Sequence, residues 1–180
     1  MTPSPTNTPL VIFKSTEESE GCEKLWCRPC YEYTAGVTNE INGEDVEFIT
    51  LRRTSGCCSW GMKMEVNTLD EKFVGTIRYR GGFRYKIEVG GGGGRQDFDM
   101  EWRGEWGFCS TKGERSFTFS RNGEEDGGFD VSFNKWNPDT PKGELKFPTF
   151  ARTAEEKIMV VAAVVNVTNG VKSEGGGAGG

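Results

Sequence analysis

The chain has 180 residues, of which 34% are apolar, and its net charge at neutral pH is -5. This length is enough for one domain with its own core, and the acidic balance argues against nucleic acid as a partner because phosphate binding needs a basic field. The chain has no histidine, so it lacks the commonest general base and any Ser–His or Cys–His nucleophile system. We therefore expect a protein that is not an enzyme.

The N-terminal region, residues 1–20, is expected to be a flexible tail and lead-in, because its first ten residues are rich in Pro, Thr and Ser. It has no basic start followed by an apolar stretch, so we predict no secretory signal. We expect an intracellular protein, cytoplasmic or peripheral to a membrane and not secreted. Its six Cys residues are then expected to be thiols.

Cys27 and Cys30 are the next feature along the chain, and their C-x2-C spacing is that of a zinc knuckle. No second C-x2-C pair follows, and no histidine can replace one. Unliganded thiols are therefore favoured over a zinc site. We expect no cofactor from these residues alone.

Strict alternation of apolar and polar residues dominates the middle of the chain. It occurs at residues 62–66, 83–89, 98–103 and 129–133, and it is typical of strands with one buried face. Turn signals separate these stretches at Asn42-Gly43, Gly81-Gly82, Asn122-Gly123 and Gly127-Gly128. Many short strands with Gly turns predict an antiparallel barrel or sandwich.

The hairpin at Gly81-Gly82 permits a prediction of register. A three-residue loop, residues 80–82, would pair Tyr79 with Phe83 and keep every apolar side chain on one face. A weak internal repeat also relates the stretch that starts at GCCSW to the stretch that starts at GFCST. Such a repeat would suit a barrel made of two similar halves.

Cationic residues are concentrated on adjacent predicted strands of this acidic chain. A basic strand face could contact an anionic lipid headgroup, although an ordinary solvated strand face is an equally good interpretation. The candidate headgroup residues are Arg52, Arg53, Arg78, Arg80, Arg84 and Lys86.

The stretch EEKIMVVAAVVNV, residues 155–167, is the densest apolar segment. Thr153 and Glu156 form a T-x-x-E capping box, and Asn169-Gly170 offers a stop. We therefore predict a helix over about residues 153–167, with a Val-rich strand as the alternative. Its apolar part would span only ~15 Å of the ~30 Å hydrocarbon layer, so we predict a helix enclosed by protein. The last residues, 170–180, are expected to be a flexible Gly-rich tail.

The order of these elements over about residues 21–168 resembles the phospholipid scramblases, which share the tubby-like C-terminal fold. The resemblance rests on VEFITLRRTSGCC at 46–58, MKMEVNTLDEKFVGTI at 62–77, and then GFC, GGFDVSFNKW and Phe147-Pro148. It implies a closed antiparallel barrel over residues 21–169 around a hydrophobic C-terminal helix. It also implies S-acylation at a Cys cluster, here Cys57 and Cys58, for which buried thiols are the alternative.

The resemblance further implies a calcium segment close to the start of the helix. Phe150, Ala151 and Arg152 stand where the family has acidic residues, and calcium requires about six to eight oxygen ligands. The candidate ligands are Asp139, Glu144, Glu155 and Glu156.

Two functions compete at this point. The first is a scramblase-like protein that contacts anionic phospholipid at an intracellular membrane surface, with transbilayer lipid movement as the activity that the resemblance implies. The second is a structural or adaptor barrel that docks on protein partners without moving lipid. A zinc-stabilised domain is a third and weaker reading.

Overall fold

The computed structural model describes residues 13–18, 33–41, 44–54, 63–90, 96–103, 112–134 and 137–175. Within these residues, ten strands form one antiparallel sheet whose strand order follows the chain order, and one helix packs against it. The elements are β1 (Phe13–Glu18), β2 (Tyr33–Ile41), β3 (Glu44–Thr54), β4 (Lys63–Thr68), β5 (Phe73–Gly81), β6 (Arg84–Val89), β7 (Phe98–Arg103), β8 (Lys112–Arg121), β9 (Glu124–Asn134), β10 (Asn137–Lys146) and α2 (Ala154–Gly175).

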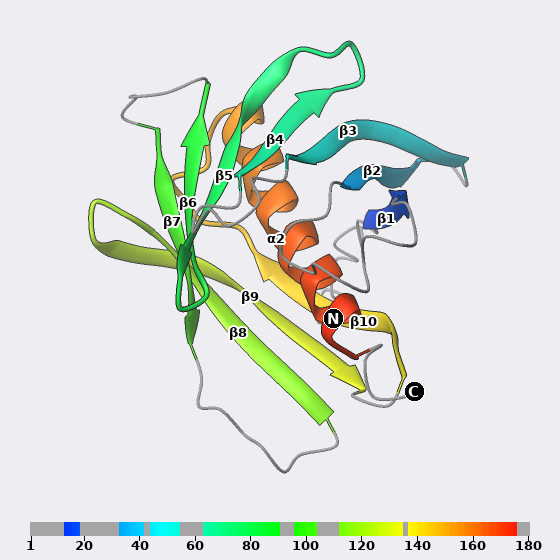
Figure 1. Cartoon of the computed structure of the whole chain (residues 1–180). Coiled ribbons are helices and arrows are strands. Elements are labelled where there is room, and N and C mark those ends of the chain that lie inside the picture. Colours follow the sequence, from blue (N-terminus) through cyan, green and yellow to red (C-terminus); the bar gives the residue numbers. More distant parts are fainter. Residues whose placement is uncertain are drawn as a thin grey trace, which may run out of the picture.

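The sheet curls around α2 (Figure 1). The helix contacts β5 and β6 in the middle of the sheet and also the last strand, β10. β1 and β10 lie at the two ends of the strand order, and no pairing joins them in the described part of the chain. The predicted fold class is thus confirmed as a mainly β protein with one antiparallel sheet and a C-terminal helix. β1 lies within the stretch expected to be a tail and lead-in.

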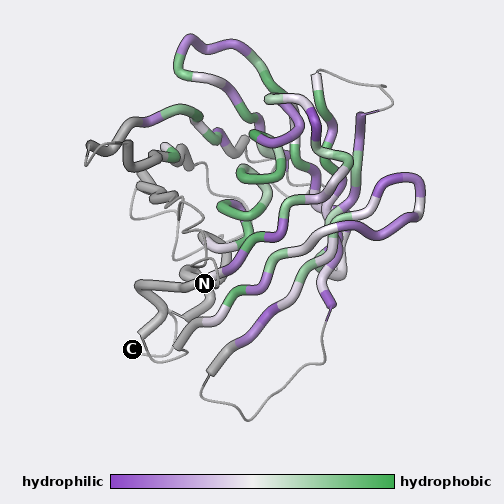
Figure 2. Tube along the Cα trace, turned by 180° about the vertical axis from the view of Figure 1, so that it is seen from behind, coloured by the Kyte–Doolittle hydropathy of each residue, from purple (hydrophilic) through white to green (hydrophobic). Residues whose placement is uncertain are grey.

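The core forms between the concave face of the sheet and the helix. Hydrophobic and hydrophilic residues alternate along the strands (Figure 2). In each predicted stretch the apolar residues with described side chains are buried, as with Met64 and Phe98, or partly buried against the core, as with Tyr85 and Trp102. Burial of such side chains contributes about 1.5–3 kcal/mol each. The alternation therefore predicted correctly which face of each strand enters the core.

At Gly75, β5 comes into close contact with the helix. A Cβ atom at this position would overlap the backbone oxygen of Glu88 and lie 2.8 Å from Sδ of Met159. Met159 is itself fully buried. The absence of a side chain at residue 75 is what lets α2 lie against β5 and β6.

The capping box at the start of α2 is confirmed. The backbone N–H of Glu156 donates to Oγ1 of Thr153 at 3.2 Å, and the N–H of Thr153 donates to Oε2 of Glu156 at 2.9 Å. The helix then continues to Gly175, so the predicted stop at Asn169-Gly170 is wrong. An Asn-Gly pair weakens a helix by about 1 kcal/mol but does not break it. Among the described residues no helix is long and apolar enough to cross a bilayer.

Two predicted turns also differ from the structure. Tyr79 pairs with Tyr85 and not with Phe83, because a bulge at Arg80 absorbs one residue and the turn proper is Gly82 and Phe83. The Gly127-Gly128 turn is wrong too, since both residues lie inside β9. There Gly127 adopts a φ of +76° at an irregularity in the β8–β9 register. In both places a bulge preserves the side-chain alternation on either side of it.

Candidate interaction surface

The convex face of β3–β7 carries four of the six candidate headgroup residues, Arg52, Arg78, Arg84 and Lys86. Antiparallel pairing places Arg52 opposite Glu65, Arg78 opposite Lys86, and Arg84 opposite Glu101. Residues directly opposite each other point to the same face of a sheet and interact. The sheet therefore brings these four cationic residues into one area, together with carboxylates from the same strands.

Most of the cations with described side chains are paired with these carboxylates. Nε of Arg78 lies 2.9 Å from Oε2 of Glu88, and Nε of Arg84 lies 2.8 Å from Oε1 of Glu101. Nζ of Lys86 lies 3.8 Å from Oδ2 of Asp97. Exposed pairs of this kind contribute at most about 1 kcal/mol each. Their main consequence is that positive and negative charges alternate over the part of this face that the structure describes.

Glu88 shows this compensation most clearly. Partial burial raises the pKa of its carboxyl, but hydrogen bonds from Arg78 and Thr76 and the positive charges of Arg78 and Lys86 outweigh it and hold the pKa below its usual value. Oγ1 of Thr76 donates to Oε2 of Glu88 at 2.8 Å. The ionised carboxylate of Glu88 is thus held in place on this face, where it offsets the positive charges of Arg78 and Lys86.

The other candidate headgroup residues differ in their surroundings. Arg80 is exposed at the bulge between β5 and β6, and Arg52 is exposed on β3. Neither has an ion-pair partner among the described side chains. Arg53 lies opposite Met64 in the β3–β4 register, and its side chain is outside the described part. The candidate residues are therefore not equivalent, because some are paired with a carboxylate and others are not.

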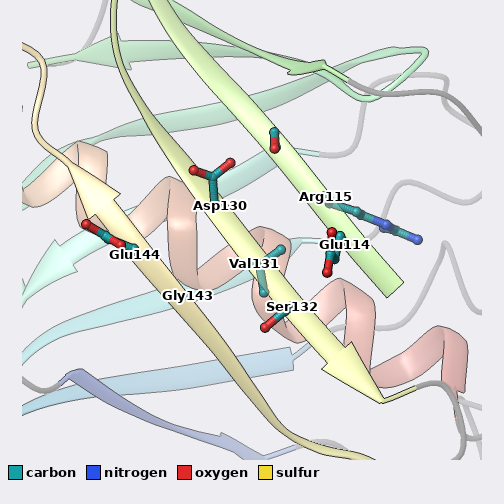
Figure 3. Close-up of a pocket in the computed structure, with 8 residues that line it drawn as sticks. Glu114, Arg115, Asp130, Val131, Ser132, Gly143 and Glu144 are labelled. Atoms are coloured by element: carbon teal, nitrogen blue, oxygen red, sulfur yellow. The ribbon is translucent and has the colours of Figure 1, made fainter. Parts of the chain in front are cut away.

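A second surface feature lies on the convex side of β8, β9 and β10, opposite the helix (Figure 3). It is an open depression of about 360 Å³. Its row of Ser116, Asp130 and Glu144 runs directly across the three strands, and all three residues are exposed. Two like charges directly opposite each other are unfavourable. The described residues that line the depression leave it open to solvent.

The candidate calcium ligands do not form a cage among the described residues. Oε1 and Oε2 of Glu156 accept hydrogen bonds from Arg121, from the backbone N–H of Arg152 and from that of Thr153, so this buried carboxylate is already satisfied. Glu144 and Glu155 are exposed. Asp139 lies on β10, with its side chain outside the described part. No group of three or more acidic or Cys side chains in the described part could hold a metal.

The Cys candidates stay predictions. Cys27 and Cys30, proposed for zinc, and Cys57 and Cys58, proposed for S-acylation, all lie outside the described residues. The structure therefore bears on neither proposal.

Sequence reasoning missed the acidic partners of the cationic face, although a signal was present. In the stretch 83–89, Glu88 shares a face with Arg84 and Lys86; in 98–103, Glu101 shares a face with Asp99. Antiparallel pairing of these stretches then sets Arg84 against Glu101. Arg121 was missed as well, and no local pattern identifies its partner 35 residues away.

Comparisons of the chain with models of protein families, with curated proteins and with solved structures found no match. The functional inference therefore rests on the geometry of the described residues.

Proposed function

We propose that the chain is a non-catalytic interaction module that docks on protein partners through its exposed strands and turns. The observation that carries this proposal is the pairing of Arg78, Arg84 and Lys86 with Glu88, Glu101 and Asp97. Anionic membranes attract surfaces with uncompensated Lys and Arg, at about 1 kcal/mol for each. A face whose cations are already paired is better suited to contact with a protein of mixed charge.

The packing of the helix supports a role exercised at the surface. α2 fills the concave side of the sheet with side chains such as Met159, Val160 and Ala163, which are fully buried. Curled sheets that bind small molecules keep an open cavity in this place. Here that space is the protein core, so binding falls to the convex face and to the turns.

The finer architecture is part of the same proposal. We propose that the sheet closes into a barrel of two similar halves, of the scramblase and tubby kind. Contact of α2 with β10 as well as with β5 and β6 supports closure, since it brings an edge strand round to the helix. Pro148, which is buried in the linker between β10 and the helix, agrees with the Phe147-Pro148 dipeptide on which the resemblance rests.

Lipid contact is the second candidate function. It is favoured by the exposed Arg52 and Arg80, which have no carboxylate partner among the described side chains, and by the direct opposition of Arg78 and Lys86. Transbilayer phospholipid movement belongs to this candidate only through the family resemblance. S-acylation of Cys57 or Cys58 would strengthen it by adding a membrane anchor.

Vesicle flotation separates the two candidates. The full chain is mixed with phosphatidylcholine vesicles with and without phosphatidylserine, and the module proposal predicts no flotation with either. The test variant is Arg78→Glu/Arg84→Glu/Lys86→Glu, and the matched control is the charge swap Arg84→Glu/Glu101→Arg, which keeps the ion pair. Flotation that requires phosphatidylserine, is lost by the triple variant and is kept by the swap would establish lipid contact and contradict protein docking by this face.

Protein docking itself is tested by quantitative cross-linking of the full chain in cells that express it. We expect reproducible protein cross-links from exposed positions of the described part. If a folded chain yields none, the module proposal is wrong.

A further inference from the structure

Two of the three large hydrophobic side chains that are exposed in the described part of the chain lie at the two ends of one turn. Leu69 is 54% exposed and Phe73 is 40% exposed, and both flank the connection between β4 and β5. Figure 1 shows this turn extending beyond the start of α2. Single exposed apolar residues are ordinary, but apolar side chains gathered on a projecting element indicate a contact site.

Backbone hydrogen bonds within the turn stabilise its conformation. The N–H of Thr68 donates to the oxygen of Lys72 at 2.9 Å, and the N–H of Glu71 donates to the oxygen of Thr68 at 3.0 Å. Glu71 has a φ of +57°, a left-handed conformation that glycine adopts with less strain. A charged residue therefore occupies a strained position at the tip, and the apolar pair is presented by a preorganised element.

The base of this hairpin is equally well supported. β5 is fixed against α2 by the close approach at Gly75, and next to it Thr76 is buried and bonded to Glu88. A projecting turn on a rigid base loses little conformational entropy on binding.

The charges of the turn select the kind of partner. Between Leu69 and Phe73 lie Asp70, Glu71 and Lys72, all exposed, which leaves a net negative charge. Insertion into an anionic bilayer would carry two carboxylates toward lipid phosphates. Symmetric contact with a second copy would set Asp70 and Glu71 against their own equivalents. A protein pocket avoids both penalties if it is apolar and has Lys or Arg at its rim.

We propose that the β4–β5 turn is the docking element of this module, and that it inserts Leu69 and Phe73 into an apolar pocket of a partner protein whose rim carries Lys or Arg side chains. This inference rests on the proposed function, because it names the surface and the partner chemistry of that module. Asp70 and Glu71 would contact the rim and set the orientation of the turn.

Site-specific photo-cross-linking tests the proposal with a matched control in the same chain. Phe73 and Phe147 are 40% and 41% exposed, so Phe73→p-benzoylphenylalanine and Phe147→p-benzoylphenylalanine present the same probe at nearly equal exposure in different parts of the chain. Each full-length variant is irradiated in cells that express it, and the adducts are identified by mass spectrometry. Unchanged thermal unfolding confirms that each variant is folded.

The expected result is a protein adduct at position 73 and not at 147, on an apolar residue with Lys or Arg neighbours. Adding Leu69→Ser should lower the yield about tenfold, as expected when a central apolar anchor of an interface is truncated. Adding Asp70→Lys/Glu71→Lys should lower it as well, because the rim charges then repel.

Results that contradict the docking turn can be distinguished from results that contradict the module function. Equal yields at 73 and 147, or a yield unaffected by Leu69→Ser, would overturn the docking turn and leave the module function standing. Adducts at 73 only with lipid or with a second copy of the chain would identify a different occupant and overturn the proposal. Loss of protein adducts from every exposed position of a folded chain would contradict the proposed function itself.

Discussion

The guanidinium of Arg121, at the end of β8, lies against the carboxylate of Glu156 in the first turn of α2, with 2.7 Å between Nη2 and Oε1. Only 16% of the Arg121 side chain and 4% of the Glu156 side chain are exposed. The same guanidinium donates to the backbone oxygen of Gln96 at 2.6 Å and lies 4.3 Å from the ring centre of Phe150. One side chain thus ties the sheet to the helix and to the linker before it.

Glu156→Gln tests this connection. The variant keeps the size of the side chain but leaves Arg121 as a buried charge without its counter-ion, so we expect a loss of about 3 kcal/mol in the free energy of unfolding. Urea unfolding followed by circular dichroism measures it. Glu155→Gln, an exposed change one residue away, should stay within about 0.5 kcal/mol.

The pair should also be non-additive. Arg121→Met/Glu156→Gln removes both charges and should be less damaging than the sum of the two single changes. Strict additivity would mean that Arg121 and Glu156 do not interact across this interface.

Acid should weaken the fold through the same carboxylate. Burial raises the pKa of Glu156, but hydrogen bonds from the Thr153 backbone and from Arg121 outweigh it, so the pKa lies below its ordinary value of 4.5. A depressed folded-state pKa stabilises the fold above the unfolded pKa, and this contribution is lost as pH falls through the folded value. The stability difference between wild type and Glu156→Gln should therefore be constant above about pH 5 and shrink below about pH 4. If the stability difference instead grew on acidification, the pKa of Glu156 would be raised in the folded protein and not lowered.

Gly75→Ala should be among the most damaging single-methyl additions to the sheet. The new Cβ would overlap the backbone oxygen of Glu88, which has little room to move, and press on Sδ of Met159. We expect a loss of about 1–3 kcal/mol, read from the midpoint of thermal unfolding. Gly82→Ala is the control, since a Cβ there meets nothing within 4 Å and only its φ of +58° opposes the change. If the two variants unfold alike, close packing at residue 75 is not what limits the β5–α2 approach.

What the sequence could predict follows from the range of the interactions involved. Alternation in a strand and the Thr153–Glu156 box depend on residues close in the chain, so burial of Phe98 and the helix start were both predictable. The bulge at Arg80 depends on which strands pair and how far they shift, and local patterns do not fix that. The environment of Arg121 brings together segments far apart in the chain, so its role emerges only in three dimensions. The charge balance of the convex face was partly predictable. Arg84 and Glu101 lie in recognisable strands, and they could be matched once the strand order was known.

Val160→Asp tests whether α2 is the centre of the core. Val160 is fully buried, and an aspartate there would be an unpaired charge among apolar side chains, at a cost of several kcal/mol. Such a cost is comparable to the whole stability of a domain of this size, so we expect unfolded or aggregated protein by circular dichroism and size-exclusion chromatography. Lys157→Asp introduces the same side chain at an exposed position of the same helix and should leave the protein folded. Because the two variants place the same side chain at a buried and at an exposed position, a folded and monodisperse Val160→Asp would mean that the helix does not occupy the concave face of the sheet in solution.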